Sequence, residues 1–224
     1  MTHYERCFEK HNFEELNNLD YNILNYAIGI FKNAHKRETG VFFDVGCNAG
    51  SFVKTLQNNG FTNNIHCFEP HPKLSNAVIE KYPHVKMNKY CLTDEIGYID
   101  INIPMWSVGL SSIINRPVFT KLQNQGQEIM KLNVETNTID NYCNENKIDV
   151  IDFIKIDVEG SEKMVLYGAD NMLKNKQIKF GLFEIGETLI DANTNEKEIS
   201  DYLEQYDYRI YTKIPNHYLF YHNS

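Results

Sequence analysis

VFFDVGCNAGSF, residues 41–52, joins an apolar run to an acidic residue and two glycines. The apolar run predicts a strand ending near Asp44, after which the chain turns through Gly46 and Gly50 into a helix starting near Ser51. Glycines at such a turn let the backbone approach a ligand closely, and the helix start offers unpaired N–H groups and positive potential. We therefore expect a ligand pocket at this turn.

Outward from this stretch, short apolar runs alternate with segments of helical periodicity. The predicted strands cover residues 41–44, 65–69, 85–91, 151–157 and 178–184. The predicted helices between them cover residues 51–59, 74–82 and 162–173. This alternation favours βαβ units and a parallel sheet, which places the chain in the α/β class. Near the C-terminus, a predicted helix at 199–206 precedes two runs, 208–213 and 217–221, that predict a closing antiparallel hairpin.

Two regions depart from the alternation. Residues 97–103 and 131–136 predict extra strands around a long connection, and long connections in compact domains are often functional. Residues 1–40 predict a helical lead-in, because apolar residues recur there at helical spacing; they are Leu16, Leu19, Ile23, Ala27 and Ile30. We expect this lead-in to precede a single domain over residues 41–224.

Composition excludes several classes of protein. The chain has 224 residues, with 22 basic and 30 acidic side chains and a formal net charge of −8, which disfavours a protein that binds nucleic acid by charge neutralisation. Its cysteines are odd in number and widely spaced, so neither a disulfide scaffold nor a zinc finger is expected. The N-terminus lacks the apolar core of a signal peptide, and no apolar run approaches the ~20 residues of a membrane span. We expect a cytoplasmic protein without a membrane span.

A second motif lies at the end of the next strand, where HCFEP carries Glu69. Glu69 follows Gly50 by 69 − 50 = 19 residues, the position from which an acidic side chain accepts hydrogen bonds from ribose hydroxyls. This spacing predicts a cofactor that contains a nucleoside. A dinucleotide fingerprint needs G-x-G-x-x-G, whereas this turn has Gly46, Asn48 and Gly50, so an NAD-type oxidoreductase is the weaker alternative. His71, next in the loop, is expected to be exposed.

The third motif, IKIDVEG at residues 154–160, carries charges in a predicted buried strand. Strands covered on both faces are normally apolar, yet Lys155, Asp157 and Glu159 alternate here, which predicts that they point to one side. Ligands of open α/β sheets bind at the carboxyl ends of the strands, so these charges should lie beside the cofactor. Glu184 ends a further strand at the same edge. The alternative is a Lys–carboxylate pair that only neutralises itself.

These motifs together resemble the FkbM family of S-adenosylmethionine-dependent methyltransferases. The resemblance covers residues 41–184 and rests on DVGCNAGSF, FEPHP, CLTD, GLSS and above all IDFIKIDVEGSEKMVLYGA at 151–169. It implies a Rossmann-like class I methyltransferase fold, with a mostly parallel seven-stranded sheet and helices on both faces. It also implies S-adenosyl-L-methionine as cofactor and O-methylation of a small or sugar-like acceptor. Cys47 and Cys91 stand where the family often has alanine.

The resemblance also implies roles for individual residues. Asp44, Gly46, Asn48 and Gly50 would cradle the methionine part of the cofactor. Glu69 would hold the ribose, and Thr93 with Asp94 would lie near the adenine. The alternative for Asp94 is a side chain that only forms the turn before Gly97.

Methyl transfer to a hydroxyl needs in-line positioning and a base, or a lowered pKa of the hydroxyl. The catalytic candidates are Lys155, Asp157, Glu159 and Glu184: Asp157 or Glu159 to orient or deprotonate the acceptor, and Lys155 to stabilise alkoxide charge. We predict no metal; the alternative is a Mg²⁺ ion held by Asp157 and Glu184. Trp106 and the loop 107–114 would either close over the acceptor or pack onto the core.

The leading function is therefore methylation of a hydroxyl on a sugar, a glycan or another small molecule. RNA ribose (cap-type) 2′-O-methylation needs the same fold, but the net charge counts against nucleic acid as a partner. A non-catalytic protein of this fold is disfavoured by the intact charged motifs. The oligomeric state is not predicted by any of these patterns.

Overall fold

A computed structural model describes residues 19–36 and 39–222. Seven strands form the main sheet in the order β3-β2-β1-β7-β8-β10-β9. Their bounds are β3 Lys86–Asn88, β2 Ile65–Phe68, β1 Phe42–Val45, β7 Ile151–Ile156, β8 Ile178–Glu184, β10 His217–Tyr221 and β9 Arg209–Ile214. The first five run parallel, whereas β10 is antiparallel to β8 and β9. The predicted α/β class, the mostly parallel sheet and the closing hairpin are confirmed, and the second strand of the hairpin is the one that pairs with β8.

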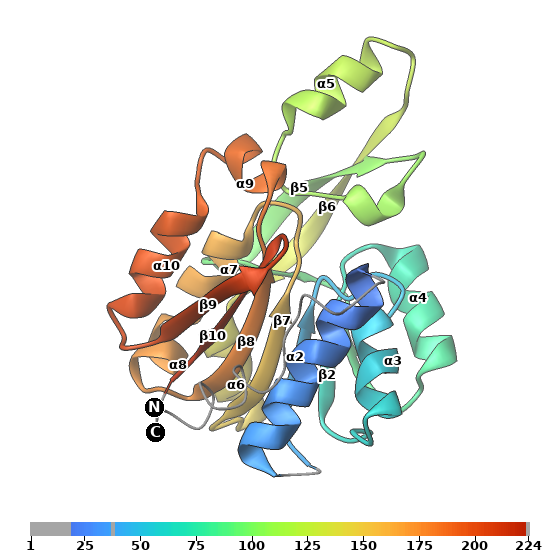
Figure 1. Cartoon of the computed structure of the whole chain (residues 1–224). Coiled ribbons are helices and arrows are strands. Elements are labelled where there is room, and N and C mark those ends of the chain that lie inside the picture. Colours follow the sequence, from blue (N-terminus) through green and yellow to red (C-terminus); the bar gives the residue numbers. More distant parts are fainter. Residues whose placement is uncertain (1–18, 37–38, 223–224) are drawn as a thin grey trace.

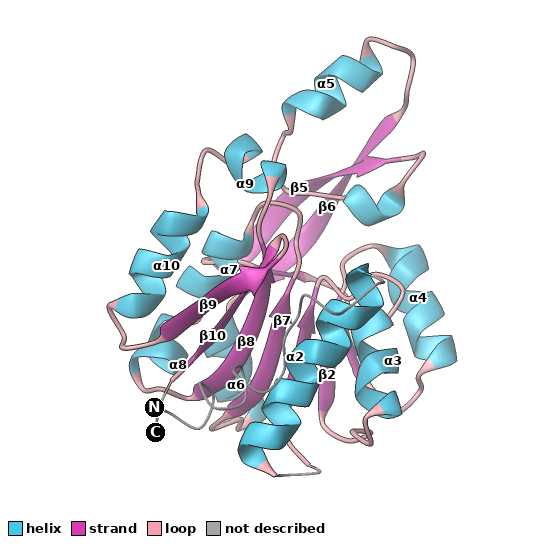
Figure 2. Ribbon diagram, in the orientation of Figure 1, coloured by secondary structure: helices cyan, strands magenta, loops and turns pink. Residues whose placement is uncertain are grey.

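Helices cover both faces of this sheet (Figures 1 and 2). One face carries α2 (Leu19–His35), α3 (Ser51–Asn58) and α4 (Pro72–Lys81), and the other carries α6 (Ile139–Asn146), α7 (Glu162–Tyr167), α8 (Asp170–Lys174) and α10 (Glu196–Glu204). Successive strand residues serve opposite faces, as the period of two requires: Phe42 packs with α2 and α3, and Phe43 packs with α6.

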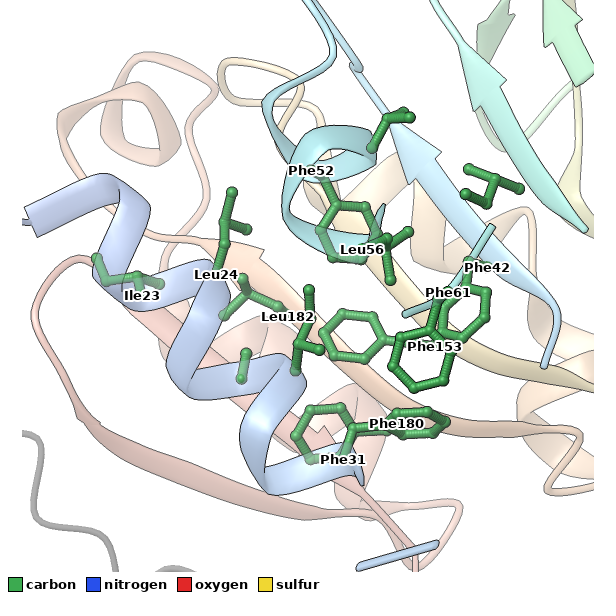
Figure 3. Close-up of a cluster of buried hydrophobic side chains, with 14 of the residues drawn as sticks. Ile23, Leu24, Phe31, Phe42, Phe52, Leu56, Phe61, Phe153, Phe180 and Leu182 are labelled. Atoms are coloured by element: carbon green, nitrogen blue, oxygen red, sulfur yellow. The ribbon is translucent and has the colours of Figure 1, made fainter. Parts of the chain in front are cut away.

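Aromatic side chains join α2 to the sheet (Figure 3). The ring of Phe31 lies 5.7 Å from that of Phe153, which in turn lies 5.0 Å from Phe180. All three are fully buried, and such burial contributes about 1.5–3 kcal/mol per side chain. The described part of the lead-in thus shares one core with the sheet. The boundary at residue 40 between the lead-in and the domain stays a prediction. Residues 1–18 of the lead-in, which include Leu16, lie outside the described part.

A smaller sheet projects beyond one end of the main sheet (Figure 1). It has the order β4-β6-β5, with bounds β4 Cys91–Leu92, β6 Ile129–Asn137 and β5 Gly97–Pro104. The connection from β5 to β6 contains η2 (Val108–Leu110) and α5 (Pro117–Gln123). Apolar residues of the strands, including Ile101, Ile103 and Val134, form a separate small cluster. The predicted extra strands around a long connection are therefore present.

The predicted strand at 85–91 is wrong as a single element. β3 ends at Asn88, whose side-chain amide donates to the carbonyl of Cys67, and the chain then leaves the main sheet. Cys91 and Leu92 pair instead with β6. An apolar run shows that a segment is buried, but it does not show which of two sheets buries it.

The predicted helix at 162–173 is also wrong, because it is interrupted between α7 and α8 at Gly168 and Ala169. A Cβ atom on Gly168 would lie 2.0 Å from the carbonyl oxygen of Thr93. The carbonyl of Gly168 accepts the N–H of Asp140 at the start of α6. The backbone contacts of Gly168 with Thr93 and Asp140 therefore accompany the interruption of the helix.

Smaller differences concern helix boundaries and one added helix. α4 begins at Pro72 and α10 at Glu196, because the side chains of His71 and Asn195 cap these helices before the first apolar residue. A short helix that the pattern does not predict, α9 (Glu187–Asp191), follows β8. In the described part of the chain, no helix is both long and apolar enough to cross a membrane, and cysteines 47, 67, 91 and 143 carry free thiols.

Gly168→Ala tests the close approach between α7 and the small sheet. We expect it to lower the free energy of unfolding by about 1–3 kcal/mol, because the new methyl group forces the backbone at Thr93 to move. Gly29→Ala is the matched control: the new methyl meets nothing within 4 Å in α2, so a gain of about 0.5–1 kcal/mol is expected. Urea unfolding measures both, and equal stabilities of the two variants would contradict the packing described.

Candidate active site

A cavity lies at the carboxyl ends of β1, β2 and β7, between the main sheet and the small sheet. It contains about 770 Å³ of space not filled by protein atoms, part of which is open to solvent. The main sheet contributes Gly46, Asn48, Glu69, Asp157 and Glu159 to its lining, among others. The small sheet and η2 contribute the opposite wall, which includes Thr93, Ile101, Val108, Ser111 and Ser112.

The two glycines of the first motif serve different contacts. Gly46 has φ +74°, and a Cβ atom there would lie 1.9 Å from the carbonyl oxygen of Asp157. Gly46 therefore allows the loop after β1 to touch the loop after β7. Gly50 has φ +78° and precedes α3, and its Cβ would lie 2.8 Å from the ring of Tyr82. Gly50 lies outside the cavity lining and serves the packing of α3 against the end of α4.

Glu69 is held by the backbone on two sides. Its Oε2 accepts the N–H of Asn48 at 3.0 Å, and its Oε1 accepts the N–H of His71 at 2.9 Å. Burial raises the pKa of Glu69, although these two bonds act in the opposite direction. A carboxylate oxygen accepts more than one hydrogen bond, so both oxygens keep capacity for a ligand in the cavity.

His71 is buried, which corrects the expectation that it is exposed. Its ring Nδ1 accepts the N–H of Lys73 and so caps α4. The residue acts on the site through its backbone bond to Glu69. No side-chain pattern in the sequence reveals such a backbone contact.

The two residues predicted near the adenine are separated by the fold. Thr93 is buried and lines the cavity, and its hydroxyl donates to the carbonyl of Glu95. Asp94 is exposed in the turn between β4 and β5 and lies outside the cavity lining.

Lys155 lies buried between two carboxylates. Its Nζ is 3.0 Å from Asp157 Oδ2 and 3.5 Å from Asp44 Oδ1, and it donates to the carbonyl of Gly46 at 3.3 Å. Burial alone favours the neutral amine, but Asp157 and Asp44 outweigh it and raise the pKa of Lys155. Burial also opposes the charged form of Asp157, but Lys155 outweighs it and lowers the pKa of that carboxyl. Both groups are therefore ionised at neutral pH.

Asp44 differs from Asp157 because it has no access to solvent. Burial raises its pKa to about 6, and Lys155 only partly offsets that effect. Within the described residues neither oxygen of Asp44 has a hydrogen-bond partner, and its charge is offset by the ion pair with Lys155 at 3.5 Å. Asp44 lies behind the loop of Gly46 rather than in the cavity lining.

Three carboxyl groups gather beside this pair. Oxygen atoms of Asp157, Glu159 and Glu184 all lie within 4.8 Å of one another. Burial and the charge of Asp157 raise the pKa of Glu184 to about 9, so Glu184 carries a proton at neutral pH and shares a hydrogen bond with Asp157. The predicted alternation along one strand does not explain how Glu159 joins this group. β7 ends at Ile156, and Glu159 adopts φ +56° in the turn that follows the strand.

Arg116 is a charged residue beside the site that the sequence patterns did not identify. It precedes α5, and its guanidinium contacts Glu159 and Asp191, each at 3.0 Å. Its place in the sequence is more than forty residues from Glu159 and Asp191, so no local spacing relates them. Trp106, in contrast, is 39 % exposed and lies outside the cavity lining, whereas residues Val108, Gly109 and Ser111 of its loop line the cavity.

The loop after β7 is also held from within by Glu162. Glu162 has no solvent access, and its Oε1 accepts the N–H groups of Val158 and Gly160 at 3.0 and 3.3 Å. From the other side, the hydroxyl of Ser112 donates to the carbonyl of Glu159 at 2.7 Å. Contacts from α7 and from the connection between β5 and β6 thus fix one short loop.

Comparison with known proteins identifies the family. The model of the Methyltransferase FkbM domain matches residues 44–210. The chain belongs to the FkbM methyltransferase family. The predicted membership of this family of S-adenosylmethionine-dependent methyltransferases is thereby confirmed.

Individual relatives are more distant. The 2-O-methyltransferase NoeI of Sinorhizobium fredii (strain NBRC 101917 / NGR234) is 27% identical over 144 residues, which are 59% of this chain and 58% of that protein. The chain thus spans a little over half of that relative. Among solved structures, the METTL16 MTase domain aligns with a TM-score of 0.51 and 12% identity, over 95% of this chain and 72% of that one. Magnesium protoporphyrin IX methyltransferase of Synechocystis PCC 6803, with bound S-adenosylmethionine, aligns with a TM-score of 0.49 and 8% identity, over 97% and 88% of the two chains. At such identity the likeness to the METTL16 MTase domain shows the fold alone.

The residues of the cavity fit this cofactor. Glu69 presents carboxylate oxygens to the cavity, which can accept hydrogen bonds from the hydroxyls of a ribose. Beside it, the turn at Gly46 has no side chain, which leaves room for the amino acid part of the cofactor. Asp157 and Glu159 also line the cavity. Their negative charge favours binding of the cationic sulfonium and ammonium groups of S-adenosylmethionine.

Glu162 offers a test of the buried loop through pH. Burial raises the pKa of Glu162 from 4.5 to about 7, so the folded state binds the proton more tightly than the unfolded state. This carboxyl therefore destabilises the fold progressively as the pH rises from about 4 to about 7. We expect Glu162→Gln, which stays neutral, to gain stability relative to the wild type over that range, by up to about 3 kcal/mol.

Urea unfolding at a series of pH values measures this difference. The control is Glu198→Gln: Glu198 is exposed and its pKa is lowered by Lys163, so its difference from the wild type should change in the opposite direction. A flat difference for Glu162→Gln would contradict a buried carboxyl at this position.

Proposed function

We propose that this methyltransferase transfers the methyl group to a hydroxyl oxygen of a sugar, a glycan or another small neutral molecule. The observation that carries the proposal is the Lys155–Asp157 ion pair of 3.0 Å at the end of β7, where Asp157 lines the cavity. An ionised carboxylate beside a fixed ammonium group provides a proton acceptor and a stabiliser of oxygen charge in one place. The name of the relative NoeI, a 2-O-methyltransferase, supports oxygen as the accepting atom.

We assign the cofactor to the cavity residues as follows. Glu69 holds the ribose, and the backbone at Gly46 and Asn48 faces the methionine part. Thr93 lies in the wall beside the adenine. Asp44 supports this arrangement from behind by fixing Lys155, and Gly50 supports it through packing. Asp94 lies off the cavity, so its role in adenine binding remains a prediction from the family motif.

When bound, S-adenosylmethionine supplies an electrophilic methyl group, so the chain's own residues need chiefly to orient the acceptor and move one proton. Asp157 accepts the proton of the acceptor hydroxyl at a carboxylate oxygen. Lys155 holds that carboxylate in place and offsets negative charge on the acceptor oxygen. Glu184 donates a hydrogen bond to Asp157 and limits its movement.

The charges around the cavity favour a neutral acceptor. Lys155 and Arg116, the cations described at this end, are both paired with carboxylates. A phosphate group would meet Asp157 and Glu159, which repel it. This balance supports a sugar-like acceptor over RNA ribose. The G-x-N-x-G turn likewise supports S-adenosylmethionine over NAD.

Glu69→Ala tests the ribose assignment. We expect the Kd for S-adenosylmethionine to rise about tenfold to a hundredfold, because a charged hydrogen-bond partner of the ligand is lost. Isothermal titration calorimetry measures the Kd. Glu135→Ala, which removes an exposed carboxylate from β6, should leave it unchanged. An unaltered Kd in Glu69→Ala would place the ribose elsewhere.

Asp157→Asn tests the proton acceptor. The variant should bind S-adenosylmethionine within about threefold of the wild type but lose about a hundredfold or more of methyl transfer. The assay follows labelled methyl from S-adenosylmethionine into a panel of simple neutral glycosides, with their phosphorylated forms as controls. Weakened cofactor binding with intact transfer would reverse the assignment. Adding EDTA to the same assay tests the prediction that no metal takes part.

A further inference from the structure

Arg116 connects three segments that are distant in the sequence. Its guanidinium contacts Glu159 in the loop after β7 and Asp191 in α9, and Arg116 itself ends the segment that leads from the small sheet to α5. The three side chains are 11%, 17% and 20% exposed, so water screens these pairs less than pairs on the open surface. The arrangement holds a cation and a carboxylate in fixed positions at one end of the cavity.

Glu159 is the member of this arrangement that faces the cavity. The residue lines the cavity together with Asp157, and an oxygen of its carboxyl group lies within 4.8 Å of oxygens of Asp157 and Glu184. Lys155 already offsets Asp157 at 3.0 Å, and Glu184 carries a proton. The charge that Glu159 adds to the cavity is therefore set by how fully Arg116 offsets it.

The cofactor and its product differ in charge. S-adenosylmethionine carries a sulfonium cation, and loss of the methyl group leaves the neutral thioether of S-adenosylhomocysteine. A carboxylate near that sulfur stabilises the first molecule and not the second, whereas a nearby guanidinium does the reverse.

We propose that the Arg116–Glu159 pair sets the preference of the cavity for S-adenosylmethionine over S-adenosylhomocysteine. Glu159 raises this preference, and Arg116 limits it. Arg116 is thus a positioning residue, which acts on the cofactor through Glu159 and not by contact. The inference rests on the proposed placement of the cofactor along Gly46, Glu69 and Asp157.

The test is the ratio of two dissociation constants, measured by calorimetry on the full chain with S-adenosylmethionine and with S-adenosylhomocysteine. Glu159→Gln should lower the preference for S-adenosylmethionine about threefold or more, because the carboxylate charge near the sulfur is lost while Arg116 keeps only Asp191 as its partner. Arg116→Gln should raise it by a similar factor, measured at about pH 8.5 so that Glu159 stays ionised. Arg116→Lys keeps the charge and should restore most of the wild-type ratio.

A purely structural role gives a different result. Loss of folded protein or distortion of the cavity weakens both ligands together and leaves the ratio unchanged. Two controls separate charge from structure: Asp191→Asn removes the other partner of Arg116, and Lys197→Gln removes an exposed lysine from a surface pair with Asp201 on α10. Lys197→Gln should leave the ratio unaltered, and Asp191→Asn should move it less than Glu159→Gln.

The outcomes distinguish failure of this inference from failure of the proposed cofactor placement. Opposite shifts in Glu159→Gln and Arg116→Gln support the inference, and if Arg116→Gln does not fold, the fall in Glu159→Gln and the rescue in Arg116→Lys still test it. An unmoved ratio in Glu159→Gln, with both ligands bound, overturns the inference alone. A wild-type chain that binds neither ligand overturns the placement of the cofactor as well.

Discussion

The ammonium group of Lys155 lies buried between the carboxylates of Asp44 and Asp157, at the carboxyl ends of the two central strands. A buried charge is costly unless another charge of opposite sign is held close to it. Because Asp44 belongs to β1 and Lys155 to β7, the pair requires these strands to lie side by side in the observed register. The same contacts bring Asp157 to the cavity. One electrostatic constraint therefore serves the centre of the sheet and the candidate site together.

Close backbone contact completes this centre. The loop after β1 touches the loop after β7 only because Gly46 has no side chain. The loop after β7 is then held by Glu162 of α7 and by Ser112 and Arg116 of the connection between β5 and β6. Such restraint suits methyl transfer, in which the alignment of the reacting atoms provides much of the rate enhancement. The small sheet is thus part of the site, since it forms one wall of the cavity and anchors the loop on the opposite wall.

Much of the fold follows from local patterns. Alternating apolar runs and helical periods predicted the parallel strands, and the Gly-turn with Glu69 predicted where a nucleoside-containing cofactor would lie. Each of these signals depends on neighbours within one βαβ unit. The split of residues 85–91 between two sheets and the break at Gly168 were not predictable in the same way. Both depend on backbone contacts with segments that are far away in the sequence, such as β6 and Thr93.

The charges at the site show the same division. The sequence by itself determined that Lys155, Asp157 and Glu159 come close together at the end of a strand, because adjacent positions in a chain cannot be far apart in space. Only the tertiary structure decided which charges pair. Lys155 forms ion pairs with Asp44 and Asp157. Glu159 lies beyond the end of the strand, has a positive φ and forms an ion pair with Arg116. It also decided that Asp94 lies outside the cavity and His71 is buried beneath it. The physical reason is that burial and pairing of a charge depend on every element packed around it, and those elements come from the whole chain.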